Sequence, residues 1–184
     1  MITTVDELIM ITGIIEQRRG VLEKQLDRKI DNYKVGFMVE TPSIIWELDK
    51  AIKHVDFISI GSNDLVQYAF AVDRNNSSAI GNFNSTNPAT IKMLKTISEI
   101  MANYPDKELT LCGEIASDPK NIPLLIGIGL KNFSMSPWLI PDIRKIVNKI
   151  SRRSSEKLVA QYIDSKDQEE ANKTLNNFIS EISD

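Results

Sequence analysis

Four short apolar runs, each followed by polar residues and then by a helical pattern, constrain the fold of this chain most strongly. The runs cover residues 34–40, 55–60, 109–112 and 131–134. They show no helical period, which is typical of strands buried on both faces of a parallel sheet. Because helical patterns separate them, the sequence predicts an α/β protein with four parallel strands.

The helical patterns lie between and around these runs. They extend from residue 4 to about 28, 42 to about 53, 65 to 72, 88 to about 103, 119 to about 126 and 141 to about 152. In the first of them, Thr4 and Glu7 have the spacing of a capping box. One face of that helix carries the apolar residues, which are Leu8, Ile11, Ile15, Leu22 and Leu26.

Two architectures fit this alternation equally well on periodicity alone. One is half of a (β/α)8 barrel, since a complete barrel needs about 250 residues and this chain has 184. The other is an open, doubly wound sheet of four strands. In both, the first and last strands are edges without partners, and such edges can pair with another chain. We expect residues 1–152 to form the α/β unit and residues 153–184 to form a helical tail that packs on it.

Composition and charge narrow the function. A net charge of -3 and a pI near 5.3 provide no general cationic field, so we expect neither nucleic acid nor a membrane as a partner. The sequence shows no membrane-spanning stretch and no signal peptide at its start. The single cysteine, Cys112, excludes an internal disulfide framework. These features predict a cytoplasmic protein.

Acidic residues end two successive predicted strands. Glu40 closes the run at 34–40, and Asp64 follows the run at 55–60. Because the carboxyl ends of parallel strands meet at one rim, the two carboxylates are candidate Mg²⁺ ligands. Each residue could instead cap a helix or lie in a solvated loop. Nearby, Asn63 and Arg74 could bind an anionic ligand, although a turn asparagine and a surface arginine are the commoner interpretations.

Cys112 ends the third predicted strand and precedes Gly113. At that rim it could act as an acid or a nucleophile, and the commoner interpretation of a lone cysteine is a small buried apolar group. The only histidine, His54, lies on the last turn of a predicted helix, where a surface position explains it without chemistry.

Several segments resemble one enzyme family. They are MVETP at 38–42, DFISIGSNDLVQYAFAVDR at 56–74, LCGE at 111–114, ASDP at 116–119 and GLKNFSMSP at 129–137. In this order and spacing they are similar to the C-terminal, phosphoenolpyruvate-binding barrel of Enzyme I, the phosphoenolpyruvate-protein phosphotransferase of the bacterial sugar phosphotransferase system. The resemblance implies a TIM barrel, and the chain then corresponds to its C-terminal half. Pyruvate phosphate dikinase and phosphoenolpyruvate synthase share the barrel.

The resemblance also implies roles for the residues at the rim. Glu40 and Asp64 would bind the Mg²⁺ that bridges the carboxylate and phosphate of phosphoenolpyruvate. Asn63, Asp64 and Arg74 would contact the substrate, and Cys112 would protonate the enolate carbon to give pyruvate. The implied partners are phosphoenolpyruvate, pyruvate and the phosphocarrier protein HPr, with homodimers in the full-length family.

The chain departs from the family pattern in several respects. The acceptor histidine of the family lies on an N-terminal domain with no counterpart in these residues, and His54 occupies no matching motif. We therefore expect the 184 residues alone to be inactive in phosphotransfer. The segment 75–87 also lacks the expected Leu-Tyr pattern. Other hypotheses are a fragment of a dikinase or synthase, a lyase on the same barrel that does not need Cys112, and a non-catalytic half-barrel assembly module.

Overall fold

The predicted strands form one parallel sheet. The computed structural model describes residues 1–31, 33–72 and 85–183. Its strands are β1 (Gly36–Val39), β2 (Phe57–Gly61), β3 (Glu108–Cys112) and β4 (Asn132–Phe133), in the order β1-β2-β3-β4. All three neighbouring pairs are parallel. The predicted α/β class is therefore confirmed, the sheet is consistent with half of a barrel, and β1 and β4 form the two edges.

The helices follow the predicted alternation with changes at their ends. They are α1 (Val5–Leu26), α2 (Pro42–Ile45), α3 (Leu48–Ala51), η1 (Ile52–His54), α4 (Ser62–Phe70), α6 (Pro88–Met101), α7 (Glu114–Ser117), η2 (Pro119–Asn121), α8 (Ile122–Gly127), η3 (Pro137–Leu139), α9 (Ile140–Lys149), α10 (Arg152–Ile163) and α11 (Gln168–Ser183). The predicted helix at 42–53 is thus divided into three short pieces.

The start of α4 differs from the prediction in a way that matters for function. The helix begins at Ser62 and not at Leu65, so Asn63 and Asp64 lie in its first turn. The apolar pattern cannot reveal this start, because the first turn of the helix consists of small polar residues that resemble a loop.

The two faces of the sheet differ in burial. On one face, residues of β1, β2 and β3 are at most 8% exposed, namely Phe37, Val39, Ile58, Ile60 and Leu111. This face belongs to the main core, which also includes apolar side chains of α2, α3, α4 and α6. On the other face, Met38 is 39% exposed and Ser59, Thr110 and Cys112 are half-buried. Polar chemistry at the strand ends is therefore accessible from this second face.

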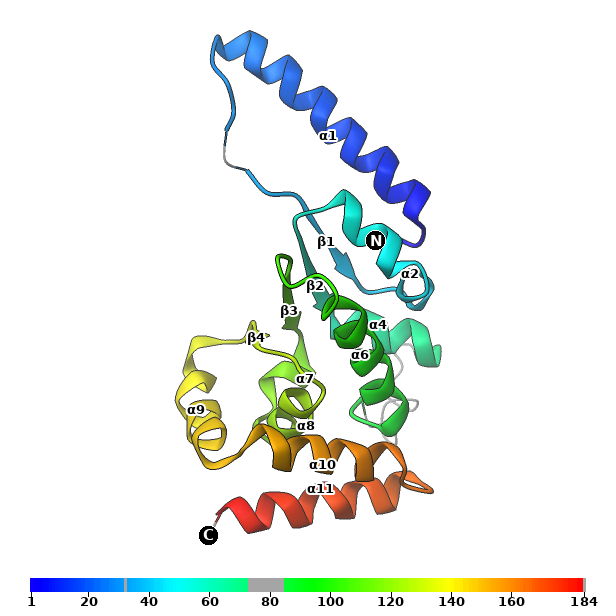
Figure 1. Cartoon of the computed structure of the whole chain (residues 1–184), viewed down its shortest axis with the longest axis vertical. Helices are drawn as coiled ribbons and strands as arrows, with labels where there is room; N and C mark the ends of the chain where they lie inside the picture. The colour runs from blue at the N-terminus through cyan, green and yellow to red at the C-terminus, as the bar shows by residue number, and fades with distance from the viewer. Residues whose placement is uncertain (32, 73–84, 184) are drawn as a thin grey trace.

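The apolar face of α1 is exposed along most of its length. Among its five stripe residues only Leu8 is buried, and the other four side chains are 36 to 52% exposed. Figure 1 shows α1 leading away from the sheet, and its helix contacts are with α3 and η1. A helical period shows which face is apolar, but whether the chain supplies a surface to cover that face depends on tertiary structure.

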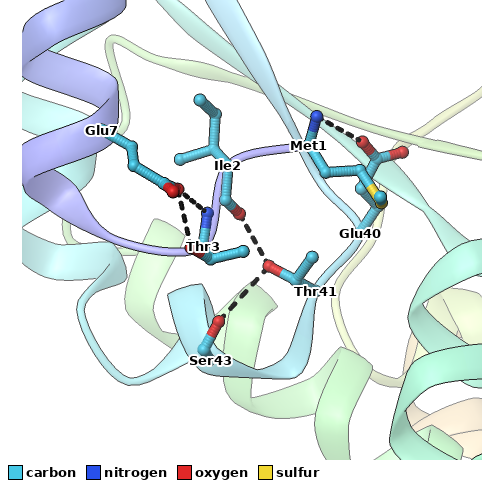
Figure 2. Close-up of polar contacts among 7 residues, drawn as sticks. All are labelled: Met1, Ile2, Thr3, Glu7, Glu40, Thr41 and Ser43. Atoms are coloured by element: carbon cyan, nitrogen blue, oxygen red, sulfur yellow. Dashed lines mark hydrogen bonds and ion pairs between the residues drawn. The ribbon is translucent and has the colours of Figure 1, made fainter.

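The N-terminus of α1 is capped, although not by the full capping box. Thr4 Oγ1 accepts a hydrogen bond from the Glu7 backbone N–H at 3.2 Å. The Glu7 carboxylate instead accepts from the backbone N–H and the hydroxyl of Thr3, at 2.7 and 2.6 Å (Figure 2). These bonds also lower the pKa of Glu7, with the Thr3 hydroxyl as the largest cause.

The C-terminal helices α10 and α11 pack one after the other on the α/β part. Helix α10 lies against α8 and α6, and α11 lies beside α10 (Figure 1). Tyr162 of α10 is fully buried, and its hydroxyl donates to the Thr86 carbonyl at 2.9 Å. Among the described residues, no helix is long and apolar enough to cross a membrane.

Helix α8 packs closely on α10 at Gly127. A Cβ atom at Gly127 would lie 2.3 Å from the backbone oxygen of Ser155, whereas a Cβ at Gly13 of α1 would meet nothing within 4 Å. We expect Gly127→Ala to lower the free energy of unfolding by about 1–3 kcal/mol, because backbone must move. Gly13→Ala should leave it unchanged or raise it by up to about 1 kcal/mol. Urea denaturation measures both, and equal effects would contradict the packing.

Candidate functional site

Glu40, Gly61 and Cys112 lie in a row across the carboxyl ends of three strands. The strand register pairs Val39 with Ile60 and Gly61 with Cys112. Glu40 follows Val39 directly, and Gly61 follows Ile60. The structure therefore brings together a carboxylate and a thiol that are 72 residues apart in sequence, since 112 − 40 = 72.

Gly61 provides the space that this row needs. A Cβ atom at Gly61 would lie 2.8 Å from Met38 Sδ and 3.2 Å from the Cβ of Glu40. A larger residue would collide with the first of these atoms and crowd the second. Glycine at the end of β2 thus allows the Glu40 side chain to lie against β2, on the side where Cys112 follows.

Cys112 is tied to β2 and to the start of α4. Its Sγ donates to the Ile60 carbonyl at 3.1 Å, and its own carbonyl accepts from Ser62 Oγ at 2.8 Å. Burial raises the pKa of the Cys112 thiol, and the negative charge of Glu40 raises it further. The thiol therefore keeps its proton at neutral pH, as a proton donor requires.

Glu40 can face a positive charge at this rim. Its side chain is 14% exposed, and Oε1 lies 3.8 Å from the Met1 amino group (Figure 2). The next residue, Thr41, donates from Oγ1 to the Ile2 carbonyl at 2.7 Å. The carboxylate is thus largely shielded from water but still within reach of a cation.

Asn63 joins the first turn of α4 to the first residue of α7. Its Oδ1 accepts from the Glu114 backbone N–H at 2.9 Å, and its Nδ2 donates to Glu114 Oε1 at 3.5 Å. Gly113, which lies between β3 and α7, has φ of 104°, and a Cβ there would lie 2.7 Å from Asn63 Oδ1. Glycine is therefore required at position 113 for its dihedral angle and for this close approach.

The remaining candidate residues are placed as follows. Asp64 is half-buried in the first turn of α4. This helix follows β2, and β2 is the neighbour of β1, the strand that precedes Glu40. Arg74 lies outside the described residues. His54 ends η1, at the amino end of β2 and so at the opposite end of the sheet from the row.

The donor set at the rim suits Mg²⁺ better than a softer metal. Glu40 and Asp64 supply carboxylate oxygens, and Mg²⁺ commonly takes one or two carboxylates with waters and phosphate oxygens completing its shell. Within residues 1–31, 33–72 and 85–183, no group of three or more His, Cys, Asp or Glu side chains could hold a metal ion. The oxygen chemistry of the two carboxylates is compatible with Mg²⁺, which would need further ligands from outside this pair.

Comparison with known proteins gives the family. A profile of PEP-utilising enzymes, PEP-binding domain, matches residues 1–152. The chain belongs to this PEP-utilising enzyme family. The predicted family resemblance is thereby confirmed.

Curated relatives of this chain carry phosphotransferase names. The phosphoenolpyruvate-protein phosphotransferase of Buchnera aphidicola subsp. Schizaphis graminum is 36% identical over 179 residues, which are 97% of this chain and 31% of the relative. That of Mycoplasma capricolum is 33% identical over 183 residues, 99% of this chain and 32% of the relative. An Escherichia coli protein named phosphoenolpyruvate-dependent phosphotransferase system is 34% identical over 164 residues, 89% of this chain and 22% of the relative. The chain thus spans about a third or less of these relatives.

The sequence did not reveal three residues that organise this rim. Ser62, Gly113 and Glu114 take part in the contacts between the start of α4 and the turn from β3 to α7. The only available signal was their position beside the strand ends. That signal places them near the rim but does not show which groups touch.

The Cys112 thiol should report the charge of Glu40. We expect the midpoint of Cys112 alkylation against pH to lie above that of the unfolded chain, because burial and Glu40 both disfavour the thiolate. Glu40→Gln should lower this midpoint, and burial should keep it above the unfolded value. Iodoacetamide labelling of the single cysteine measures the profile. Glu99→Gln, in an exposed pair with Lys95 on α6, is the control. An unchanged midpoint in Glu40→Gln would contradict the proximity.

Proposed function

We propose that this chain is the phosphoenolpyruvate-binding part of a phosphoenolpyruvate-protein phosphotransferase. The observation that carries the proposal is the row of Glu40, Gly61 and Cys112, which sets a protonated thiol beside a carboxylate at the rim of a parallel sheet. Family membership supports the substrate class. The names of the relatives favour a phosphotransferase over a dikinase or a synthase.

In this proposal, the residues of the rim bind phosphoenolpyruvate through its charges. Glu40 and Asp64 hold Mg²⁺, which when bound neutralises charge on the carboxylate and phosphate of the substrate. Asn63 donates from Nδ2 to the phosphate and gives up its long bond to the Glu114 carboxylate. Arg74 supplies a second, charged donor to the phosphate.

The chemistry then divides between phosphoryl transfer and proton transfer. The bond between phosphorus and the enol oxygen breaks as a nitrogen of a protein histidine takes the phosphoryl group. The electron pair of the broken bond stays on the oxygen, which gives the enolate of pyruvate. Cys112 gives its proton to the methylene carbon, so that a C–H bond forms as the S–H bond breaks. The thiolate regains a proton from solvent. Its raised pKa keeps the thiol protonated before each turnover.

The wider assignments belong to the same proposal. Residues 1–152 form the phosphoenolpyruvate-binding unit of a TIM barrel, and residues 153–184 form a helical tail. The phosphoryl group passes to the phosphocarrier protein HPr in a cytoplasmic sugar transport system, and the full-length protein is a homodimer. The names of the relatives support the phosphotransferase system as the setting.

Calorimetry with phosphoenolpyruvate tests the proposed ligand site. We expect binding that requires Mg²⁺ and is weakened about tenfold or more by Glu40→Ala and by Asp64→Ala, since each change removes a metal ligand. Cys112→Ala should bind with nearly unchanged affinity, because the thiol acts after binding. Glu99→Ala is the matched control for loss of one exposed carboxylate. Equal affinity in the wild-type, Glu40→Ala and Asp64→Ala proteins would reject the metal assignment.

A further inference from the structure

We propose that Ser62 is a positioning residue for Cys112. The inference rests on the proposed function in one respect, namely that the thiol is a proton donor. Ser62 is the first residue of α4 and is 0% exposed. Its hydroxyl donates across to the next strand, where the Cys112 carbonyl accepts at 2.8 Å.

Three consecutive residues hold Cys112 in place. Gly61 is its partner in the strand register, Ile60 accepts a hydrogen bond from its thiol, and Ser62 donates to its carbonyl. The Ile60 bond directs the sulfur, and the Ser62 bond fixes the backbone from which the sulfur projects. Without Ser62, the last residue of β3 would be held only by the strand ladder and by its own thiol.

The Ser62 bond also answers two requirements of buried polar groups. A buried hydroxyl is costly unless it is hydrogen-bonded, and a carbonyl at a strand end also needs a donor. Ser62 and Cys112 meet both requirements with one bond. Ser155, also 0% exposed, provides the contrast, because its Oγ has no hydrogen-bond partner within the described parts of the chain.

The turn after Cys112 is shaped to bring Ser62 close. A Cβ at Gly113 would lie 2.3 Å from Ser62 Oγ, so only glycine leaves room for the hydroxyl at that point. Asn63 then binds the backbone N–H of Glu114 one residue further along. The two bonds tie the start of α4 to both sides of Gly113, so the backbone of Cys112 and the amide of Asn63 are joined through one turn.

This arrangement has a consequence for a proton donor. Proton transfer to carbon requires the donor to lie within hydrogen-bond reach of a defined atom. Ser62 therefore acts on the reaction through Cys112 and has no contact with substrate in this assignment. Its hydroxyl should be replaceable by another hydroxyl but not by a methyl group.

The test uses the single cysteine of the 184-residue chain. Cysteine labelled with ¹³C at the carbonyl gives one resonance, that of Cys112. We expect Ser62→Ala to shift this resonance. At one fixed pH, the variant should also change the rate of Cys112 alkylation by iodoacetamide about fivefold, because the loss of one hydrogen bond corresponds to a factor of about this size. Ser62→Thr should restore both readouts. Ser155→Ala should leave both at the wild-type values.

Thermal unfolding of each variant shows that it folds. If Ser62→Ala unfolds, the proposal is tested on Ser62→Thr alone. A wild-type resonance and alkylation rate in Ser62→Thr then support the proposal, and altered values overturn it. A wild-type resonance and alkylation rate in folded Ser62→Ala would overturn the proposal, as would a similar change in Ser155→Ala. Both readouts are taken without phosphoenolpyruvate. Failure of the proposed function would appear separately, as loss of Mg²⁺-dependent binding in calorimetry.

Discussion

The parallel register of β1, β2 and β3 is the constraint on which the site depends. It aligns the carboxyl ends of the strands, so that Glu40, Gly61 and Cys112 become neighbours across the sheet. Each of these strands is followed almost at once by a short helix. Because the ends are aligned, the polar residues at the helix starts meet at the same rim, as they do in other α/β folds. A slip of one residue in β3 would turn the Cys112 side chain to the opposite face.

Crowding at this rim explains its small residues. At Gly61 a side chain would meet Met38 and Glu40, and at Gly113 it would meet Ser62 and Asn63. The backbones approach closely enough for side chains of one strand end to bond the backbone of the next. This closeness also accounts for the raised pKa of Cys112, because the thiol is partly withdrawn from water and lies near the charge of Glu40. The close packing of the rim and the raised pKa of the Cys112 thiol therefore have the same structural cause.

Periodicity and composition predicted the strands, their parallel arrangement and the rim that carries Glu40, Asn63, Asp64 and Cys112. They did not predict which of these residues touch, because contacts such as Ser62 with Cys112 depend on the register between strands. The early start of α4 was hidden because small polar residues occur both in loops and in first helical turns. The exposure of α1 could not be read from the sequence for another reason. Its apolar stripe is correct as a pattern, but burial requires a second surface.

The exposed stripe of α1 and the open edge of β1 belong to one region. A groove of about 220 Å³ lies between them and is lined by Leu8, Ile11 and Ile15 on the helix and by residues 35–38 near the strand. Glu40 also lines this groove, whereas the bonds of Cys112 and Asn63 involve β2, β3, α4 and α7. The thiol side of the site is therefore set by interior strands with partners on both sides. The carboxylate side is set by the edge strand β1, and Glu40 lines the groove beside that edge.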